Sequence, residues 1–589
     1  MPVALPSVVP DRSPSQPSGG LKTTASTIPQ PEQAHFRDDV GTVPDPPDAN
    51  ERTFLGYLRT SLGLSMLGIT VAQLYRLQHS SNPNPTLGYF ILSKPIAGIF
   101  QCSAICMTLL GAIRFYRQQQ AMSVGKVHAG GWEILTVIGL VFLIYTDEGQ
   151  LVWFGPNVTA NNFKWQLFDK EPTLSYWSGV SSNGVNTGHG YSNVTLLDSG
   201  YNVRYVVCPN LDLTIPGNET FDCQADLHEC YLTDRNTIFI TAYNATQTDL
   251  TAVNGTSDGW VFDYLSFEID PKTGKVLFRW SALEHVPVAD SHELLAATGN
   301  ASVLYDWFHI NSVINVGDHF LVNSRHTWTV YYLDSEGRID WRLAGDTGGD
   351  FGELPTEGTF RWQHHPRAHN VTESAFDPSL FNNNNQALDN SSSHPTSALV
   401  YRLPFQPTNT TSSQAQLLRH LTNDPPLFAD SQGSYTPDLS TRNQLATFRQ
   451  IPLIKEYGPT TDGSDVRWTG RAGPDNGTQI YRGFKEVWHA TPAATAPSLA
   501  VLPRDESAGG VHAAEGYYGY VSWNGATDVS GWNIYVSEGG RGGVKKAGEA
   551  GFRGFETRFE VPCWATGVQV GAVVDGSEVR RSDEVAVGG

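Results

Sequence analysis

The chain has 589 residues, of which 40% are hydrophobic, so it is too long for one ordinary domain and has ample material for a core. Its formal net charge of −20 argues against nucleic acid as the main partner, because phosphate binding needs a basic face. Fifteen Trp and 23 Tyr, against 4 Met, favour strands with aromatic side chains over helical bundles.

The N-terminal part predicts a tail followed by membrane helices. Residues 1–50 are rich in Pro, Ser and Thr without apolar periodicity, so we expect a disordered cytosolic tail. Three apolar runs follow, at about residues 55–75, 90–113 and 131–145. The first two have the length that crosses a bilayer, about 20 residues, and the third is short. The loop before the third run carries Arg114, Arg117 and Lys126. Positive loops stay in the cytosol, so we expect three transmembrane helices with everything after the third outside.

The first apolar run opens with a distinctive motif, Glu51-Arg52-Thr53-Phe54-Leu55-Gly56-Tyr57-Leu58-Arg59-Thr60-Ser61-Leu62. This motif resembles the opening of the DUF202 family, a small three-helix membrane domain of unknown biochemical role. The resemblance covers about residues 51–146 and implies a membrane anchor without supplying chemistry. We interpret Arg59 as an interfacial residue whose side chain reaches the headgroups.

The N-glycosylation motif N-x-S/T occurs only after the apolar runs. Its asparagines are Asn157, Asn193, Asn218, Asn244, Asn254, Asn300, Asn370, Asn390, Asn409 and Asn476. Because this motif is used outside the cytosol, we expect an integral membrane glycoprotein whose large part is lumenal or at the cell surface. The same compartment permits disulfides. Cys208, Cys223, Cys230 and Cys563 would form two, with the pairing left open.

From Asp147 onward, short alternating runs punctuated by Gly, Asp and Asn indicate strands joined by hairpins. One element recurs, in which a turn with Asp and Gly leads into a short run that closes on Trp. The closing residues are Trp153, Trp280, Trp341 and Trp468. Repeats of this kind are typical of a β-propeller, which we predict for residues 147–490. An irregular β-sandwich is the alternative.

Three further segments complete the predicted organisation. Residues 373–415 are rich in Asn, Ser and Thr and predict a long surface loop. Residues 493–589 have the cadence of an immunoglobulin or fibronectin-like β-sandwich. Leu140–Tyr145 also admits a second interpretation, as a propeller strand paired with the run from Leu151. That pairing would truncate the third membrane helix and leave the first blade incomplete.

Four segments place His or Arg at the end of a predicted strand, where a propeller would gather them at the top of its central channel. They are Asp226–Glu229, Asp306–Ser312, Asn323–Thr327 and Trp362–His365. Imidazoles act as nucleophiles, acids or bases near neutral pH, and a guanidinium suits a sulfate or phosphate group. This chemistry predicts transfer or hydrolysis of an oxyanion ester. Three histidines can also hold zinc, which we disfavour because an arginine would lie beside the metal.

These segments resemble the arylsulfotransferases that work without a nucleotide donor, especially their fungal relatives. Further matches are Leu151-Val152-Trp153-Phe154-Gly155-Pro156, Gly188-His189-Gly190-Tyr191 and Trp341-Arg342-Leu343-Ala344-Gly345. The resemblance runs over most of residues 147–589. It implies a six-bladed propeller without a cofactor. It also implies a ping-pong reaction, in which a histidine takes a sulfuryl group from a small aryl sulfate and passes it to a phenol.

The resemblance assigns roles by position. His364 matches the histidine that becomes sulfated, His309 and Arg325 match the residues that hold the sulfuryl oxygens, and His228 matches the further active-site histidine. A one-residue slip from His364 to His365 stays open.

Two other residues are candidates for substrate binding. Asn311 is a possible additional donor to the substrate, and His189 lies in a Gly-His-Gly turn that would line the channel. Two other functions stay open: a non-catalytic surface propeller that binds carbohydrate or protein, and a membrane accessory protein whose helical part carries the function.

Overall fold

The structure, a computed structural model, describes residues 143–589 with short gaps, and nine single positions before residue 143. The gaps are residues 157, 159, 182–187, 217–218, 386–393, 408–413, 439, 450, 474–478, 505–515, 540–542 and 589. The chain divides into two compact units, Met1–Val127 and His128–Gly589.

In the first unit the nine described positions are helical. The Ser61 hydroxyl donates to the Ala104 carbonyl at 2.7 Å and lies 2.7 Å from the Thr108 hydroxyl, so two helical stretches touch there. No helix among the described positions is both long and apolar enough to span a membrane. The predicted tail and most of the predicted spans at 55–75 and 90–113 lie outside the described residues.

The described part of the second unit begins with a hairpin at residues where the third membrane helix was expected to end. Strand β1 (Leu143–Tyr145) pairs antiparallel with β2 (Leu151–Phe154). The Gly149 amide donates to the Thr146 carbonyl at 2.9 Å, and Gly149 takes a φ of 77°, which suits a tight turn. The prediction of a membrane helix up to Tyr145 is therefore wrong, and the alternative pairing with the run from Leu151 is the one observed.

Five four-stranded antiparallel sheets follow, each with its strands in sequence order. The first sheet holds β3 (Ala160–Phe168), β4 (Glu171–Ser181), β5 (Gly190–Leu197) and β6 (Val203–Val207). The second holds β7 (Cys230–Leu232), β8 (Ile238–Thr248), β9 (Gly259–Ile269) and β10 (Val276–Ser281). The third holds β11 (Ile310–Val316), β12 (His319–Ser324), β13 (Thr329–Leu333) and β14 (Ile339–Ala344). The fourth holds β15 (His364–His369), β16 (Ala375–Asn382), β17 (Ser397–Pro404) and β18 (Gln416–Thr422). The fifth holds β19 (Ser434–Pro437), β20 (Gln444–Phe448), β21 (Leu453–Tyr457) and β22 (Val466–Arg471).

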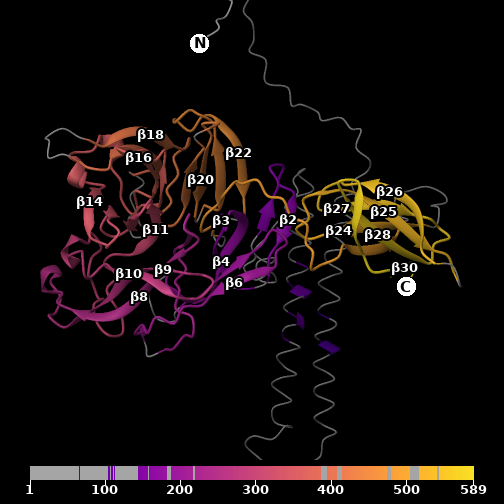
Figure 1. The fold of residues 1–589 in the computed structure, drawn as a ribbon, viewed down its shortest axis with the longest axis horizontal. Coiled ribbons are helices and arrows are strands. Elements are labelled where there is room, and N and C mark those ends of the chain that lie inside the picture. The colour runs from indigo at the N-terminus through magenta and orange to yellow at the C-terminus, as the bar shows by residue number, and fades with distance from the viewer. Residues whose placement is uncertain are drawn as a thin grey trace, which may run out of the picture. The chain divides into compact units, whose positions relative to one another are not determined.

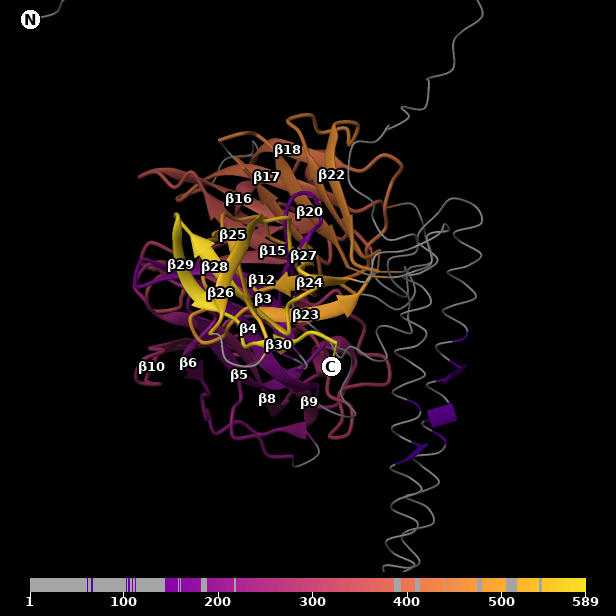
Figure 2. The ribbon, with the colours of Figure 1, turned by 90° about the vertical axis from the view of Figure 1, so that its right-hand side faces the viewer.

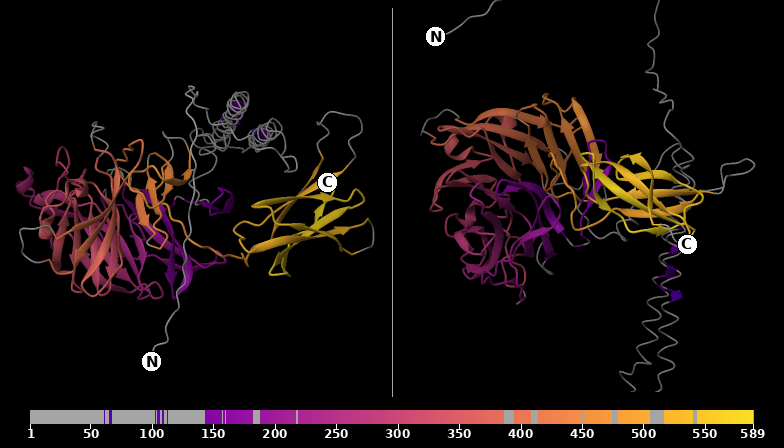
Figure 3. Two further views of the ribbon diagram at one scale, coloured as in Figure 1. Left: turned by 90° about the horizontal axis from the view of Figure 1, so that it is seen from above. Right: turned by 45° about the vertical axis from the view of Figure 1, so that its right-hand side comes forward.

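The sheets are arranged around a common centre in a propeller-like manner (Figures 1 and 3). The first strands of neighbouring sheets contact one another, β3 with β7, β11 with β15, and β15 with β19. Strands such as β13 are buried along their whole length, which explains their β-branched and aromatic residues. Short 3-10 turns connect some strands, at Thr251–Val253, Val288–Asp290, Gly349–Phe351 and Thr356–Gly358. The mainly β prediction is confirmed, and the number of six blades stays a prediction.

The recurring Trp element marks the last strand of a sheet. Trp280, Trp341 and Trp468 lie in β10, β14 and β22. Trp153 takes the same place in β2, which has only β1 beside it. Within the described residues the hairpin thus corresponds to the last two strands of a sheet.

The predicted surface loop at 373–415 is wrong in its main part. Strands β16 and β17 lie inside it, and most of their residues are buried. The prediction was based on the polar composition of the whole segment. The apolar residues of both strands form only short runs between polar stretches, so they did not indicate strands. Asn382 and Asn383 are themselves buried, at 1% and 0% exposure.

The C-terminal part folds as two packed sheets, shown in yellow in Figure 2. One holds β23 (Ser498–Pro503), β24 (Tyr517–Ser522) and β27 (Glu556–Val561). The other holds β25 (Val529–Ser537), β26 (Lys545–Gly551), β28 (Gly567–Val574), β29 (Ser577–Arg581) and β30 (Val585–Ala586). Val521, Trp532 and Val570 lie in their shared core. The Asn524 amide bonds to both backbone groups of Phe154, each at 3.0 Å, which joins this part to β2.

One of the two expected disulfides is present. Cys208 is bonded to Cys223. The second is wrong, because Cys230 is buried in the core of the propeller-like part and free, whereas Cys563 is exposed and free.

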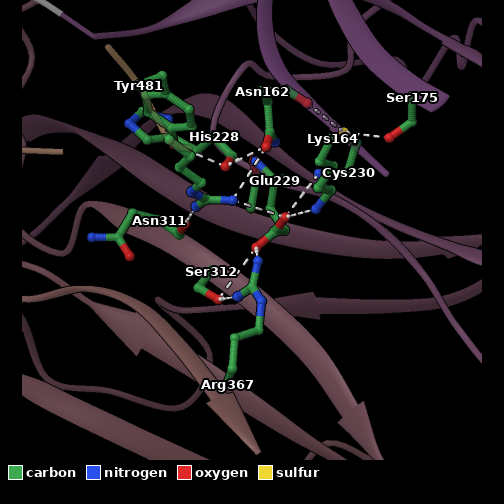
Figure 4. A network of polar contacts seen from close by, with 12 residues as sticks. Asn162, Lys164, Ser175, His228, Glu229, Cys230, Asn311, Ser312, Arg367 and Tyr481 are labelled. Atoms are coloured by element: carbon green, nitrogen blue, oxygen red, sulfur yellow. Dashed lines mark hydrogen bonds and ion pairs between the residues drawn. The ribbon is translucent and has the colours of Figure 1, made fainter. Parts of the chain in front are cut away.

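One buried carboxylate interacts with side chains from several sheets at their common centre (Figure 4). Glu229, the residue before β7, accepts hydrogen bonds from Lys164 of β3 at 2.6 Å and Arg367 of β15 at 2.8 Å. Arg482, which follows β22, donates to the same carboxylate at 3.1 Å, and the Ser312 hydroxyl of β11 lies 3.3 Å from it. Four successive sheets and the segment after the fifth therefore share one buried ionic network, called here the Glu229 cluster.

Glu229→Gln keeps the side-chain shape but leaves three cations around a neutral amide. Breaking a buried ion pair typically costs about 3–5 kcal/mol, and we expect a loss of this size in the free energy of unfolding. Urea unfolding followed by Trp fluorescence measures it. Glu549→Gln, whose partner Lys546 is also exposed, is the control and should leave the midpoint unchanged. Equal midpoints for Glu229→Gln and the unchanged chain would contradict the importance of the cluster.

Candidate active site

The candidate side chains lie at strand ends near the centre. His228 and His309 come just before β7 and β11, Arg325 directly follows β12, and His364 is the first residue of β15. The backbone φ is 53° at His309 and 56° at Trp362. Left-handed conformations at non-glycine residues cost of order 1–3 kcal/mol and cluster at functional sites.

Three imidazoles converge on one another. The ring centroids of His228 and His309 are 4.9 Å apart, and the His189 ring lies 5.5 Å from His309 and 6.0 Å from His228. All three side chains are buried. His189 also bonds to the Tyr264 hydroxyl at 3.1 Å and stacks on the Tyr243 ring at 4.2 Å. The structure therefore brings His189 into the same cluster as the two predicted catalytic histidines.

Two carboxylates orient two of these rings. His228 Nδ1 lies 2.8 Å from Asp226 Oδ2, and His309 Nδ1 lies 2.8 Å from Asp306 Oδ2. Each Nδ1 therefore carries the proton and donates it to a carboxylate. Within the described part of the chain neither Nε2 has a hydrogen-bond partner, so both remain free for chemistry. Burial holds the pKa of His309 well below its ordinary value, although Asp306 acts in the opposite direction.

Arg325 is connected to the histidine cluster through its neighbour. Its Nη1 donates to His326 Nε2 at 2.5 Å, and His326 Nδ1 donates to the Asp306 carbonyl at 2.5 Å. Arg325 Nη2 donates to the Asp430 carbonyl at 3.1 Å, and its guanidinium lies 4.9 Å from the Trp362 ring centre. These contacts fix a partly buried guanidinium, which stays charged because arginine does not lose its proton in proteins.

His364 has a defined tautomer. Its Nδ1 lies 2.7 Å from Asn383 Oδ1 and 3.0 Å from the Trp362 carbonyl, and both are acceptors. The proton therefore sits on Nδ1, and the Nε2 lone pair accepts a long hydrogen bond from the Gln432 amide at 3.2 Å. Burial, together with the positive charge of Arg325, holds the pKa of His364 well below its ordinary value. A neutral imidazole with its lone pair on Nε2 is the nucleophilic form.

Asn383 contacts the candidate nucleophile His364, a contact that the sequence did not reveal. It lies in the Asn-rich run that was read as a surface loop, yet its amide donates to the Ala429 and Gln432 carbonyls at 3.1 and 3.0 Å. It therefore fixes both the His364 tautomer and the Gln432 segment. The available signal was its place shortly after the apolar pair Leu380 and Phe381 of β16, at the end where the other site residues gather.

Asn311 and His365 have surroundings different from those expected. Asn311 donates to the Gln363 carbonyl at 2.9 Å and accepts from Asn323 at 2.8 Å, so it supports the peptide that carries His364. Its contact with a substrate stays a prediction. His365 is buried where the charges of Arg367 and Arg482 act on it, so it belongs with the Glu229 cluster and not with the three imidazoles.

One grouping among the described residues has ligand atoms spaced for a metal ion. The atoms of His189, Asp306 and His309 lie within 4.8 Å of one another. Two nitrogens and one oxygen suit zinc by type. However, Asp306 already accepts from the Tyr264 hydroxyl and from His309, so the arrangement suits proton transfer at least as well.

Comparisons with known proteins place most of the second unit in a family. Residues 164–472, a little over half of the chain, match the family described as Arylsulfotransferase (ASST). Residues 46–121 match the Domain of unknown function DUF202. No curated protein matches the sequence.

Solved structures show only distant likenesses. The match to a periplasmic gluconolactonase of Pseudomonas aeruginosa has 10% sequence identity and a TM-score of 0.28. It covers 58% of this chain and 96% of the gluconolactonase chain. An α-L-arabinofuranosidase from Lactobacillus brevis has 9% identity and a TM-score of 0.27, with 56% and 95% covered. Scores this low support no conclusion about fold or activity.

The His364 geometry predicts a pH-insensitive tautomer. With ¹⁵N-labelled histidine, the His364 ring should keep the neutral form with the proton on Nδ1 from about pH 8 down to about pH 5.5, below the ordinary histidine pKa of about 6.5. A lowered pKa delays protonation to more acidic solution. Asn383→Leu removes one of the two acceptors of Nδ1 and should weaken the preference for a proton on Nδ1. Protonation of His364 near pH 6.5 would contradict the role of burial and Arg325.

Proposed function

We propose that this chain, which belongs to the arylsulfotransferase (ASST) family, moves a sulfuryl group from an aryl sulfate to a phenol through a covalent intermediate on His364. The observation that carries the proposal is a neutral imidazole whose lone pair on Nε2 accepts one long hydrogen bond, from the Gln432 backbone amide, within the field of the fixed Arg325 guanidinium. Attack on a sulfate ester needs two groups, a nucleophile and a fixed cation that offsets the charge on the sulfuryl oxygens.

In the first half-reaction, His364 Nε2 attacks sulfur and the bond from sulfur to the aryl oxygen breaks. The departing phenolate takes a proton from protonated His228 and leaves as a phenol. His364 keeps its Nδ1 proton and becomes a sulfated imidazolium. The Asn383 and Trp362 oxygens, at 2.7 and 3.0 Å, accept from this more acidic N–H and stabilise the intermediate.

In the second half-reaction, the oxygen of an acceptor phenol attacks sulfur while its proton passes to His228 Nε2. The bond from sulfur to His364 breaks, and its electrons return to the nitrogen. His228 ends protonated, as it began, so the cycle balances. Asp226, 2.8 Å from His228 Nδ1, stabilises the charged ring in both directions.

The sulfuryl oxygens gain negative charge in both transition states. Arg325 offsets this charge from a fixed position. A bound sulfate ester also favours the protonated form of His309, whose Nε2 would then donate to an oxygen. The Gln432 amide already points at His364 Nε2 and is placed to donate to a sulfuryl oxygen once the N–S bond forms.

The same proposal places the enzyme on a membrane with its catalytic part outside the cytosol. The match to DUF202 supports the anchor. The Cys208–Cys223 disulfide supports an oxidising compartment. Among the described motif asparagines, Asn254, Asn300 and Asn370 are exposed, as attachment of glycans requires. The fungal-type subfamily and the three-helix count belong to this proposal as well.

His364→Ala should abolish exchange of the sulfuryl group between an aryl sulfate and a phenol. In the unchanged enzyme, incubation with the donor alone should add a sulfuryl mass to the peptide that holds His364, seen by mass spectrometry under mild alkaline conditions. His369→Gln, a substitution on the same strand that keeps a donor near Ser379, is the control and should retain exchange. A sulfated peptide in His364→Ala would show that another group is the nucleophile.

Expression of the full chain in a eukaryotic host tests the compartment. We expect an endoglycosidase to increase its electrophoretic mobility, and the shift to shrink when Asn254, Asn300 and Asn370 are replaced by Gln. An identical mobility before and after the enzyme treatment would count against a lumenal or extracellular position.

A further inference from the structure

The Glu229 cluster contains more positive than negative charge. Lys164, Arg367 and Arg482 surround one carboxylate, and the Lys164 and Arg482 side chains are 3% and 1% exposed. Buried charges are normally paired, because an unpaired ion loses its hydration without compensation. Burial lowers the pKa of Lys164. Even with Lys164 neutral, two arginines against Glu229 leave an excess of one positive charge.

Unused polar groups lie beside this charge. His365 is 1% exposed, and neither of its ring nitrogens has a hydrogen-bond partner in the part of the chain that the structure describes. Among the same residues, the hydrogen bond of Lys164 Nζ goes to Glu229, which leaves at least one further N–H of this amine to spare even when the amine is neutral. The charged groups that act on the His365 ring are Arg367, Arg482, Glu229 and Lys164, the members of the cluster themselves.

We propose that the Glu229 cluster binds a small inorganic anion of the halide class, held by His365, Arg367 and Lys164. One monovalent anion balances the excess charge of the two arginines and accepts from the unused His365 N–H. A halide also needs little room and gives up its water more readily than sulfate or phosphate. Arg367, at 15% exposure, is the most open member and offers the route of entry.

This site is separate from the proposed sulfuryl site. His364 bonds to Asn383 and to the Gln432 backbone amide. The His365 ring has no such partner among the described residues, and His365 lies two residues before Arg367 of the Glu229 cluster. An anion bound at His365 would make no contact with the reacting atoms. Its effect is therefore on stability, which can be measured without any sulfuryl transfer.

Thermal unfolding of the purified full chain in sodium chloride, bromide or gluconate at matched ionic strength tests the proposal. Chloride and bromide should raise the midpoint by about 2–4 °C for each tenfold increase above the dissociation constant, and gluconate should not. His365→Phe fills the same space without nitrogen atoms and should lose this dependence. His369→Gln, on the same strand, should keep it.

Three results would overturn the proposal. The first is equal stabilisation by gluconate and the halides. The second is an undiminished halide effect in His365→Phe. The third is a bromide-soaked crystal without an anomalous peak within hydrogen-bond distance of His365 and Arg367, which would leave water as the partner of the ring. If His365→Phe fails to fold, Arg367→Gln provides the same comparison. His364→Ala should keep the halide dependence, so failure of the sulfuryl proposal is read separately.

Discussion

The structure depends on how a set of sheets is joined at its centre. Sheets that follow one another around an axis bury their first strands together, and polar side chains on those strands must then find partners without water. Glu229 solves this for several sheets at once, because its two oxygens accept from cations on β3, β15 and the segment after β22. The same residue follows His228, whose carbonyl is held by Asn162 at 3.2 Å and Tyr481 at 2.9 Å. The central ion pairs and the position of His228, a candidate catalytic residue, therefore depend on the same short segment.

The site uses the same side-chain type for different tasks by changing its partner. His228 and His309 each donate from Nδ1 to a carboxylate, which stabilises a charged ring. His364 donates to an amide oxygen and a carbonyl, which fix the tautomer without favouring the charge, and Arg325 opposes protonation. Environments that give groups of one type different pKa values in this way allow one of them to act as a nucleophile and others as acids or bases.

Local patterns predicted the parts that depend on local physics. The hairpins that end on Trp correctly predicted the last strands of the sheets, because alternation and turn residues depend only on neighbouring positions in the sequence. The errors came from tertiary context. The sequence around Asn383 is typical of a loop, but Asn383 follows β16 directly and is buried. Leu143–Tyr145 has the composition of the end of an apolar helix, but the turn at Gly149 allows it to pair with β2. Glu229 and Arg482 are unremarkable charges in the sequence, because their meeting joins residues 253 positions apart.

That separation has a consequence for synthesis of the protein. The ribosome makes about 5–20 residues per second, so Glu229 emerges roughly 10–50 s before Arg482. During this interval the nascent second sheet can collapse around a carboxylate that lacks one of its cations, and its inner strands have no closing segment. The centre can therefore be completed only after most of the chain has been made. The early sheets would need shielding by chaperones until Arg482 has been made.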